Sequence, residues 1–207
     1  MNRRLCCGLL AAVLVWAPLA PAQGVQAMPA ETGPAIPTGP AASVMLGANI
    51  CIPNGDADCD ETDAGFGMSL SALWRFIPWL AGQFDFFYGM YDTPSGTDMD
   101  SLGILFGPRG FIPIGPVDIS AGVGVGWGKY TVSGGGEEFT LSGFTMGFLL
   151  GVEYRIIPWV AAGAAFRFHL PLFDEACQGS VCADIPDDAD IAQEMMVGAH
   201  ATFYFIP

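Results

Sequence analysis

Nine ionisable side chains occur inside segments whose residues otherwise alternate between apolar and small types. They are Arg75, Asp85, Arg109, Asp118, Glu153, Arg155, Arg167, His169 and His200. When residues are counted along each segment from the nearest proline, the acidic and basic members lie at similar distances from the predicted turns. Charges that are removed from water need partners and hydrogen bonds to be stable. We therefore expect these side chains to meet as a network of ion pairs in the interior of the fold.

A second interpretation of the same residues is a narrow path for ions. The segment from Gly122 to Gly128 has a glycine at every second position, which could leave room beside the charges. Glycine at these positions could equally make space for Phe87, His169 or Tyr204. The network of ion pairs is the interpretation we prefer, and the ion path is the alternative.

Catalysis is the third interpretation, and His169 is the residue that could support it. Its neighbours Asp174 and Glu175 could assist a histidine in acid–base chemistry. However, a catalytic histidine paired with a serine two residues along the same strand is absent, because His169 is followed by Leu170 and Pro171. We expect His169 to take part in a hydrogen-bond network and the protein not to be an enzyme.

The elements that position these side chains are β-strands. Eight segments alternate with a period of two, which is the signature of strands with one apolar face. Phe/Ile-Ile-Pro occurs four times, ending at Pro78, Pro113, Pro158 and Pro207. Proline cannot donate to a strand ladder and belongs at strand ends. The repeats therefore predict three turns and a chain end on one rim, and hence four hairpins of two strands each.

The distribution of charge decides which face of these strands points outward. Charged residues make up only 14% of the chain, against about 25% in ordinary soluble domains. Within the strands they share a face with glycine, serine and threonine, while the opposite face is almost purely apolar. An outward face so poor in charge would aggregate in water. After the first 22 residues, no segment is apolar over enough residues to form a transmembrane helix. The sequence therefore predicts an all-β, eight-stranded, antiparallel up-and-down transmembrane β-barrel.

The first 41 residues lie outside this pattern. Residues 1–22 have the basic, apolar and small-residue regions of a signal peptide. Residues 23–41 are rich in Pro, Ala and Gly and predict a flexible periplasmic lead-in, so the barrel is expected over 42–207. Removal of the signal peptide takes two arginines with it, so five basic residues remain against 21 acidic ones. We therefore expect no nucleic-acid partner.

Aromatic residues lie near both ends of the predicted strands. The expected girdle residues are Trp74, Trp79, Trp127, Tyr154 and Trp159, and Tyr88, Tyr91 and Tyr130 lie at the same end as Trp127. Two aromatic girdles are typical of a barrel that spans a membrane. The connections beside the prolines are short, and those at the other end are long, at 51–64, 91–100, 131–138 and 171–192. Because outer-membrane barrels keep their short turns in the periplasm, both chain ends are expected there.

Leader, strand number, alternation and girdles together resemble the small eight-stranded outer-membrane barrel proteins of Gram-negative bacteria, the OmpA-barrel and OmpX-like group. The resemblance is architectural and covers roughly residues 42–207. It implies an outer-membrane location, contact with membrane lipids and lipopolysaccharide, and insertion by the barrel assembly machinery. The chain differs from the usual pattern at its end, where Phe205 is followed by Ile206 and Pro207 instead of being the last residue.

Four cysteines follow residue 22, in two close pairs: Cys51 with Cys59, and Cys177 with Cys182. A disulfide within each predicted loop is the natural interpretation in an exported chain. Four cysteines allow three connectivities, and the spacing alone does not choose among them. Metal binding by thiolates is the weaker alternative, because no histidine accompanies either pair.

Seventeen of the 21 acidic residues fall in the long loops, which contain no lysine or arginine. One loop carries closely spaced carboxylates: Asp56, Asp58, Asp60, Glu61 and Asp63. A calcium loop would have glycine at position six and glutamate at position twelve, and both are missing. We interpret the loop as a solvated acidic segment beside anionic lipopolysaccharide. A weak calcium site that bridges the loop and lipid headgroups is the alternative, and no other cofactor is expected.

The sequence thus predicts an outer-membrane barrel with a structural or surface-interaction role, an ion-paired lumen and acidic, disulfide-pinned extracellular loops. A narrow, porin-like channel for ions or solutes is the alternative. A lipid-modifying enzyme of the outer membrane is the third hypothesis.

Overall fold

The computed structural model describes residues 36–55, 59, 63–91, 98–134, 136–186 and 189–205. No helix of the length and apolarity needed to cross a membrane occurs in these residues. Their secondary structure is β-strand. The strands are β1 (Gly39–Ile52), β2 (Gly65–Ile77), β3 (Leu80–Tyr91), β4 (Asp98–Ile114), β5 (Val117–Gly134), β6 (Glu137–Ile157), β7 (Val160–Gln178), β8 (Val181–Asp184) and β9 (Gln193–Tyr204).

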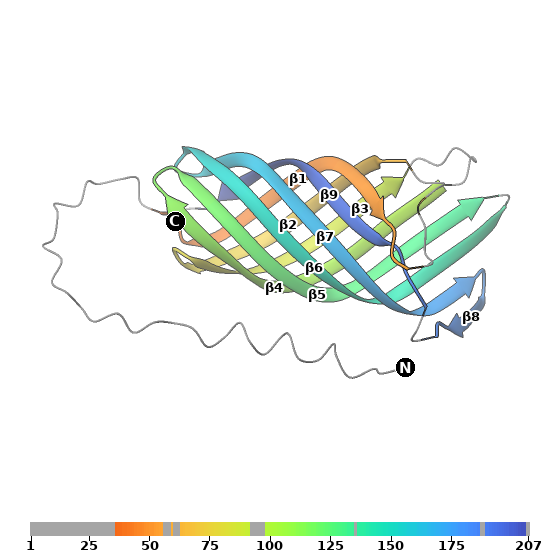
Figure 1. The fold of residues 1–207 in the computed structure, drawn as a ribbon. Helices are drawn as coiled ribbons and strands as arrows, with labels where there is room; N and C mark the ends of the chain where they lie inside the picture. The colour runs from red at the N-terminus through yellow and green to blue at the C-terminus, as the bar shows by residue number, and fades with distance from the viewer. Residues whose placement is uncertain are drawn as a thin grey trace, which may run out of the picture. The chain divides into compact units, whose positions relative to one another are not determined.

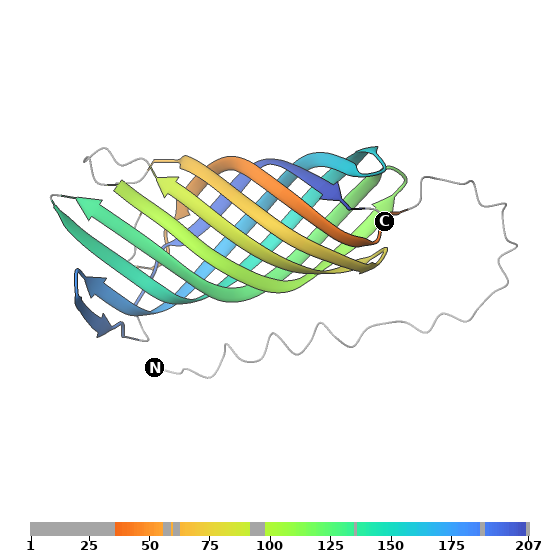
Figure 2. The same ribbon diagram turned by 180° about the vertical axis from the view of Figure 1, so that it is seen from behind.

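Eight of these strands close into a ring (Figures 1 and 2). Each strand from β1 to β7 pairs antiparallel with the next one. β9 then pairs with both β7 and β1, which joins the two ends of the sheet. The eight-stranded, antiparallel, up-and-down barrel predicted from the sequence is confirmed. β8 is not part of the ring and pairs with the end of β7.

Alternation places apolar side chains on the outer wall and polar ones inside. On β6, Leu150 and Val152 are 58% and 50% exposed, whereas the intervening Glu153 is 1% exposed. The same parity holds on β4, where Phe106 is 66% exposed and Arg109 is fully buried. An outer wall of this composition matches a hydrocarbon environment, in which a charged side chain would be costly.

Two of the proline repeats form turns as expected, and one does not. The turns after β2 and β6 contain Pro78–Trp79 and Pro158–Trp159. The prediction was wrong for Pro113, which lies within β4; the turn follows at Gly115–Pro116. Gly115 has a φ of 61°, and glycine adopts this left-handed conformation without the steric penalty of a side chain. The local backbone requirement of the turn therefore sets the end of β4.

The strands extend further than the sequence predicted. The barrel starts at Gly39 instead of residue 42. At the opposite end, the segments 131–138 and 171–192, which were expected as loops, contain the ends of β5 and β7, the start of β6, and all of β8. The cause is long-range pairing: β6 pairs with both β5 and β7 over these residues, and this pairing outweighs their polar composition.

Inside the ring, close packing depends on particular glycines. A Cβ atom added at Gly103 on β4 would lie 2.8 Å from the carbonyl oxygen of Trp127 and against the ring of Phe87. Gly110, on the same strand, has no neighbour closer than 3.8 Å to an added Cβ. The two glycines belong to the same strand, but Gly103 is buried on the lumen side and Gly110 lies on the outward face, where an added Cβ has space.

We predict that Gly103→Ala lowers the free energy of unfolding by about 1–3 kcal/mol, because overpacking displaces Phe87 and the neighbouring backbone. Gly110→Ala is the matched control and should change it by about 0.5 kcal/mol or less. Urea unfolding of the barrel refolded into lipid vesicles measures both values. Equal losses in the two variants would contradict the packing argument.

Candidate functional site

The interior of the ring contains all nine ionisable residues that the sequence singled out. Each is buried, with an exposed fraction between 0% for Arg109 and 6% for Arg155. A tenth member is Glu194, one of the seventeen acidic residues that the sequence assigned to the long loops; it was counted there at the strand edge, but it lies within β9 and is 1% exposed. Four arginines and four carboxylates therefore face one another in the described lumen. Their contacts form successive layers along the barrel axis.

The layer nearest the short turns is organised around Asp118. Its Oδ2 atom lies 2.9 Å from Nη1 of Arg75 and 3.3 Å from Nη2 of Arg155. The Arg75 Nε atom donates to the carbonyl oxygen of Pro78 at 3.0 Å, and its guanidinium lies 4.2 Å from the centroid of the Phe111 ring. Two arginines thus share one carboxylate, and the turn carbonyl and the aromatic face stabilise the additional positive charge.

The next layer is centred on Arg109, which donates to three side chains. Its Nη2 atom lies 2.7 Å from Oε1 of Glu153 and 2.9 Å from Oγ of Ser120. Its Nη1 atom lies 3.4 Å from Oε1 of Gln83. Glu153 also faces Nδ1 of His200 at 3.3 Å. The 2.7 Å charge-assisted hydrogen bond between Arg109 and Glu153 is among the stronger polar contacts in a protein interior.

A third layer joins side chains from three strands around Asp85. Arg167 on β7 donates from Nη2 to Oδ1 of Asp85 and to Oγ of Ser71, both at 2.9 Å. Ser71 and Gln83 also donate to the Asp85 carboxylate. Because β7 lies across the ring from β2 and β3, the Arg167 side chain spans the lumen.

The layer nearest the long loops joins His169 to Glu194, the one member that the sequence did not single out. Nδ1 of His169 lies 3.7 Å from Oε2 of Glu194, and Ser101 donates to the other carboxylate oxygen at 3.0 Å. The His169 ring stacks on Phe87 with 3.9 Å between the ring centroids. Parity along β9 could have revealed Glu194, since it is six residues from the inward-facing His200 and so shares its face.

The glycines of β5 are covered by lumen side chains. An added Cβ at Gly122 would lie 3.6 Å from Cβ and Cγ of Arg109, and one at Gly124 would lie 3.2 Å from Cβ of Leu105. Beside them lies a cavity of about 10 Å³, lined by residues that include Asp85, Arg167 and Leu105. That volume is the space for about one water molecule.

The five predicted girdle residues are all exposed: Trp74, Trp127 and Tyr154 on the outer face of strands, and Trp79 and Trp159 in the short turns. Their exposed fractions are 55% for Trp74, 59% for Trp79, 41% for Trp127, 55% for Tyr154 and 55% for Trp159. Two tyrosines expected in the same girdle point inward instead: Tyr91 is 4% exposed and Tyr130 is 6% exposed. Their parity on β3 and β5 places them on the lumen face, although their residue type suits a membrane interface.

Both expected disulfides are present, Cys51–Cys59 and Cys177–Cys182. The second one joins two paired strands, β7 and β8, and was expected in a loop. Glu175 has a carboxylate oxygen close to both sulfur atoms of this disulfide. Sulfur atoms in a disulfide are not thiolates, so this group lacks the ligand chemistry of a metal site.

Of the candidate cation ligands, the structure describes Asp63 alone. Asp56, Asp58, Asp60 and Glu61 lie outside the described residues. The calcium site therefore stays a prediction from the sequence.

No known protein family matches the chain, and no curated protein is similar to it in sequence. Solved structures are similar in fold. Neisserial surface protein A is 17% identical, with a TM-score of 0.62 over 81% of this chain and 98% of that one. The chain has the fold of the small outer-membrane β-barrel proteins.

Two further structures agree with this assignment. Ail, the attachment invasion locus protein of Yersinia pestis, is 16% identical, with a TM-score of 0.50 over 80% of this chain and 99% of that one. The outer membrane protein OprG of Pseudomonas aeruginosa is 12% identical, with a TM-score of 0.50 over 81% and 98%. At these identities the similarity concerns the fold.

We predict that Arg109→Met destabilises the barrel by about 3–5 kcal/mol, because Glu153 then remains buried without its arginine. The double variant Arg109→Met/Glu153→Gln should be more stable than the single variant, since it removes the uncompensated charge. Lys129→Met, on the outer face, is the control and should have an effect below about 0.5 kcal/mol. Urea unfolding in vesicles measures all three, and a double variant less stable than Arg109→Met would contradict the ion-pair interpretation.

Proposed function

We propose that this protein is an integral outer-membrane barrel with a closed lumen, whose role is structural or lies in surface interaction. The observation that carries the proposal is the filled interior, in which four arginines are held by carboxylates from other strands. An eight-stranded barrel is just wide enough to be filled by side chains. A lumen occupied in this way supports a role carried by the outside of the barrel and by its long-loop end.

The proposed role is not enzymatic. Both histidines are buried inside the ring, at 2% exposure for His169 and 3% for His200. His169 is covered by the Phe87 ring and faces Glu194. A lipid or peptide substrate would need to reach these side chains, and their burial supports a part in the ion-pair network instead.

We further propose that the short turns face the periplasm and the long-loop end faces outward. The first strand begins and the last strand ends at the side of the short turns (Figure 1). Outer-membrane barrels have short periplasmic turns and longer extracellular connections. The expected partners of the outer wall are membrane lipids and lipopolysaccharide.

Closure predicts electrical silence. We expect the refolded wild-type barrel to give no conductance steps in planar lipid bilayers, because arginines span and seal the lumen. A variant with Arg155→Ala and Arg167→Ala removes two of these side chains and should produce discrete steps. Both proteins need to show the mobility of a folded barrel in unheated gels before the recording.

Two results would count against closure. Discrete, charge-selective steps in the wild type would show a narrow channel, the alternative that the β5 glycines favour. Silence in a folded double variant would show that the two arginines do not seal the lumen. Val181→Ala, on the outer hairpin, is the control and should behave as the wild type does.

Membrane embedding predicts a depth-dependent penalty for charge on the outer wall. Leu150→Arg should destabilise the barrel in vesicles by about 2–4 kcal/mol, because the arginine would face hydrocarbon. Val181→Arg is the matched control: Val181 is 73% exposed on β8, beyond the ring, and its substitution should be nearly neutral. Equal effects in the two variants would contradict embedding of the β6 wall.

A further inference from the structure

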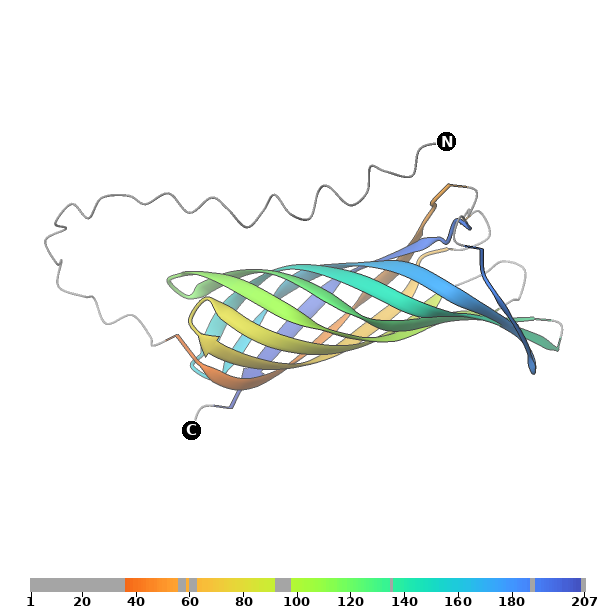
Figure 3. The same ribbon diagram turned by 90° about the horizontal axis from the view of Figure 1, so that it is seen from below.

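The sheet continues beyond the ring at the long-loop end and stops at a free edge. β5, β6 and β7 extend past the other strands (Figure 3), and β8 adds a short hairpin partner to β7 (Figure 1). In the part of the chain that the structure describes, β8 pairs with β7 and with no other strand. All four β8 residues are exposed. An unpaired edge is a template for another extended chain unless the sequence protects it.

One face of this extension is acidic. Residues that pair directly across a sheet share a face, and Ser142, Glu175 and Asp184 form such a row across β6, β7 and β8. Glu175 and Asp184 are therefore like charges directly opposite each other, an arrangement that destabilises a pair of strands. Lys129 belongs to the same row on β5, two strands or about 10 Å from Glu175. A cation beside β8 would relieve this repulsion.

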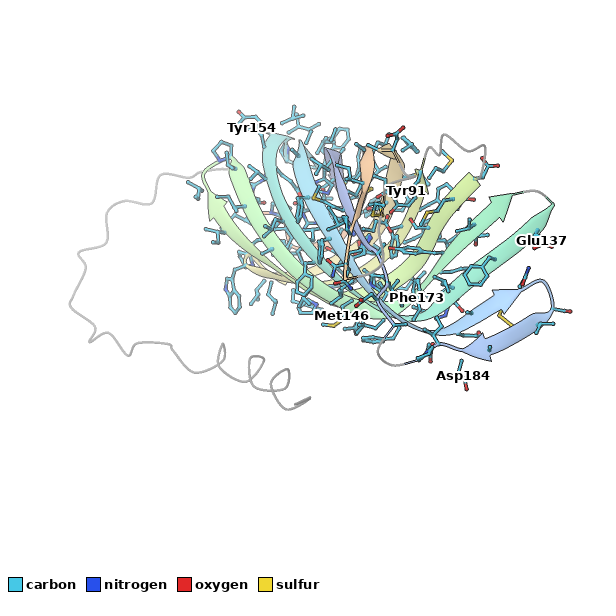
Figure 4. The ribbon with its side chains drawn as sticks, turned by 45° about the vertical axis from the view of Figure 1, so that its right-hand side comes forward. Tyr91, Glu137, Met146, Tyr154, Phe173 and Asp184 are labelled. Atoms are coloured by element: carbon cyan, nitrogen blue, oxygen red, sulfur yellow. A yellow bond between two sulfur atoms is a disulfide. The ribbon has the colours of Figure 1, made fainter. Side chains whose placement is uncertain are left out.

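The other face of the extension is mainly apolar, and its polar side chains are paired with each other: Gln178 donates to Glu137 at 2.7 Å. Ala176 lies opposite Ala183, and Gln178 lies opposite Val181. Val181 is 73% exposed, and Phe139, which pairs with Gln178 on this face, is 42% exposed. Figure 4 labels two residues of the extension: Glu137, where β6 begins, and Asp184, where β8 ends. The edge of β8 thus separates an acidic face from an apolar face.

The backbone of β8 has hydrogen-bonding groups on the free edge. The Cα atoms of Cys177 and Cys182 are 4.0 Å apart, which is the short spacing of a non-hydrogen-bonded antiparallel pair. The N–H and C=O groups of such a residue point away from its partner strand. Cys182, and by the alternation Asp184, therefore direct their backbone groups towards the edge that β7 leaves unpaired.

We propose that this edge binds an extended peptide segment in which basic and apolar residues alternate. A strand added to β8 would bond to the backbone of Cys182 and Asp184. Its side chains beside Asp184 would lie on the acidic face, where lysine or arginine fits, and those beside Val181 and Ala183 would lie on the apolar face. The inference rests on the proposed outward orientation of the long-loop end and deepens the surface-interaction role by naming the partner chemistry.

A defined probe tests this pattern. The probe is an acetylated, amidated octapeptide that alternates lysine and valine, labelled with a fluorophore, and its binding to the refolded barrel in non-ionic detergent at 150 mM salt is followed by anisotropy. One control peptide has four lysines followed by four valines. The other keeps the alternation but has glutamate in place of each lysine. We expect saturable binding of the alternating peptide, at least tenfold weaker binding of the block peptide, and none of the acidic one. Equal binding of the alternating and block peptides would overturn the proposal, because charge alone would then explain it.

Variants at one position separate the backbone contact from the charge. Asp184→Asn keeps the N–H group and should weaken binding about twofold to fivefold. Asp184→Pro removes the charge and the N–H group together, and should weaken binding about tenfold further. Asp98→Asn, at the same end of the barrel on β4, is the matched control and should bind as the wild type does. Gel mobility and circular dichroism confirm folding of each variant before the titration.

The outcomes distinguish this proposal from the proposed function. Equal binding by Asp184→Pro and Asp184→Asn would overturn the edge contact. Absence of binding by a folded wild type that is silent in bilayers would remove the docking surface and leave the closed barrel intact. Steps in the wild type together with the expected binding series would overturn closure and retain the docking surface.

Discussion

The structure depends on the closure of a single sheet. In hydrocarbon every backbone N–H and C=O group must be paired within the protein, because no water is available to replace a missing hydrogen bond. Pairing of β9 with both β7 and β1 meets this requirement for the eight strands of the ring. Closure then sends alternate side chains to the inside, whatever their chemistry. The outer face is free to be apolar, and the lumen must accommodate every charge.

This requirement explains the order of the lumen. A buried arginine is stable only beside carboxylates and acceptors that replace its water shell, and each of the four arginines here faces a carboxylate on a different strand. Gly122 of β5 provides space for one of these long side chains, because the Arg109 side chain lies directly over it. The lumen therefore has to satisfy both the charge of each arginine and its volume, and a glycine on the neighbouring strand supplies part of that volume.

Beyond the ring, backbone groups need not be paired within the sheet and side chains need not be apolar on the outside. The ends of β5 to β8 extend past the strands that close the barrel, so their backbone groups can bond to water or to another chain. The Cys177–Cys182 disulfide links β7 and β8 and holds a strand of four residues that would be marginal alone. Water solvates carboxylates, so an acidic face such as that of Glu175 and Asp184 is stable outside the membrane. The same chain therefore has an uncharged wall and a charged extension beyond the ring.

Much of this architecture follows from local pattern. Alternation predicted the strand number, the antiparallel connections, the inward position of residues such as Arg167 and the outward position of residues such as Trp159, because a period of two assigns a face without reference to any partner. Pro78 and Pro158 marked their turns for an equally local reason, the missing N–H group.

Other features depended on partners far away in the sequence. Which carboxylate meets which arginine is set by strand stagger, so Asp118 could not be assigned to Arg75 and Arg155 from the sequence. The sheet continues past 171 because β6 offers a pairing edge there, and a polar composition concealed it. Tyr91 and Tyr130 entered the lumen because parity outweighs the preference of tyrosine for an interface. The sequence by itself determined the face of most strand side chains, since that depends on the backbone period; the tertiary structure decided their neighbours, since those depend on register between strands.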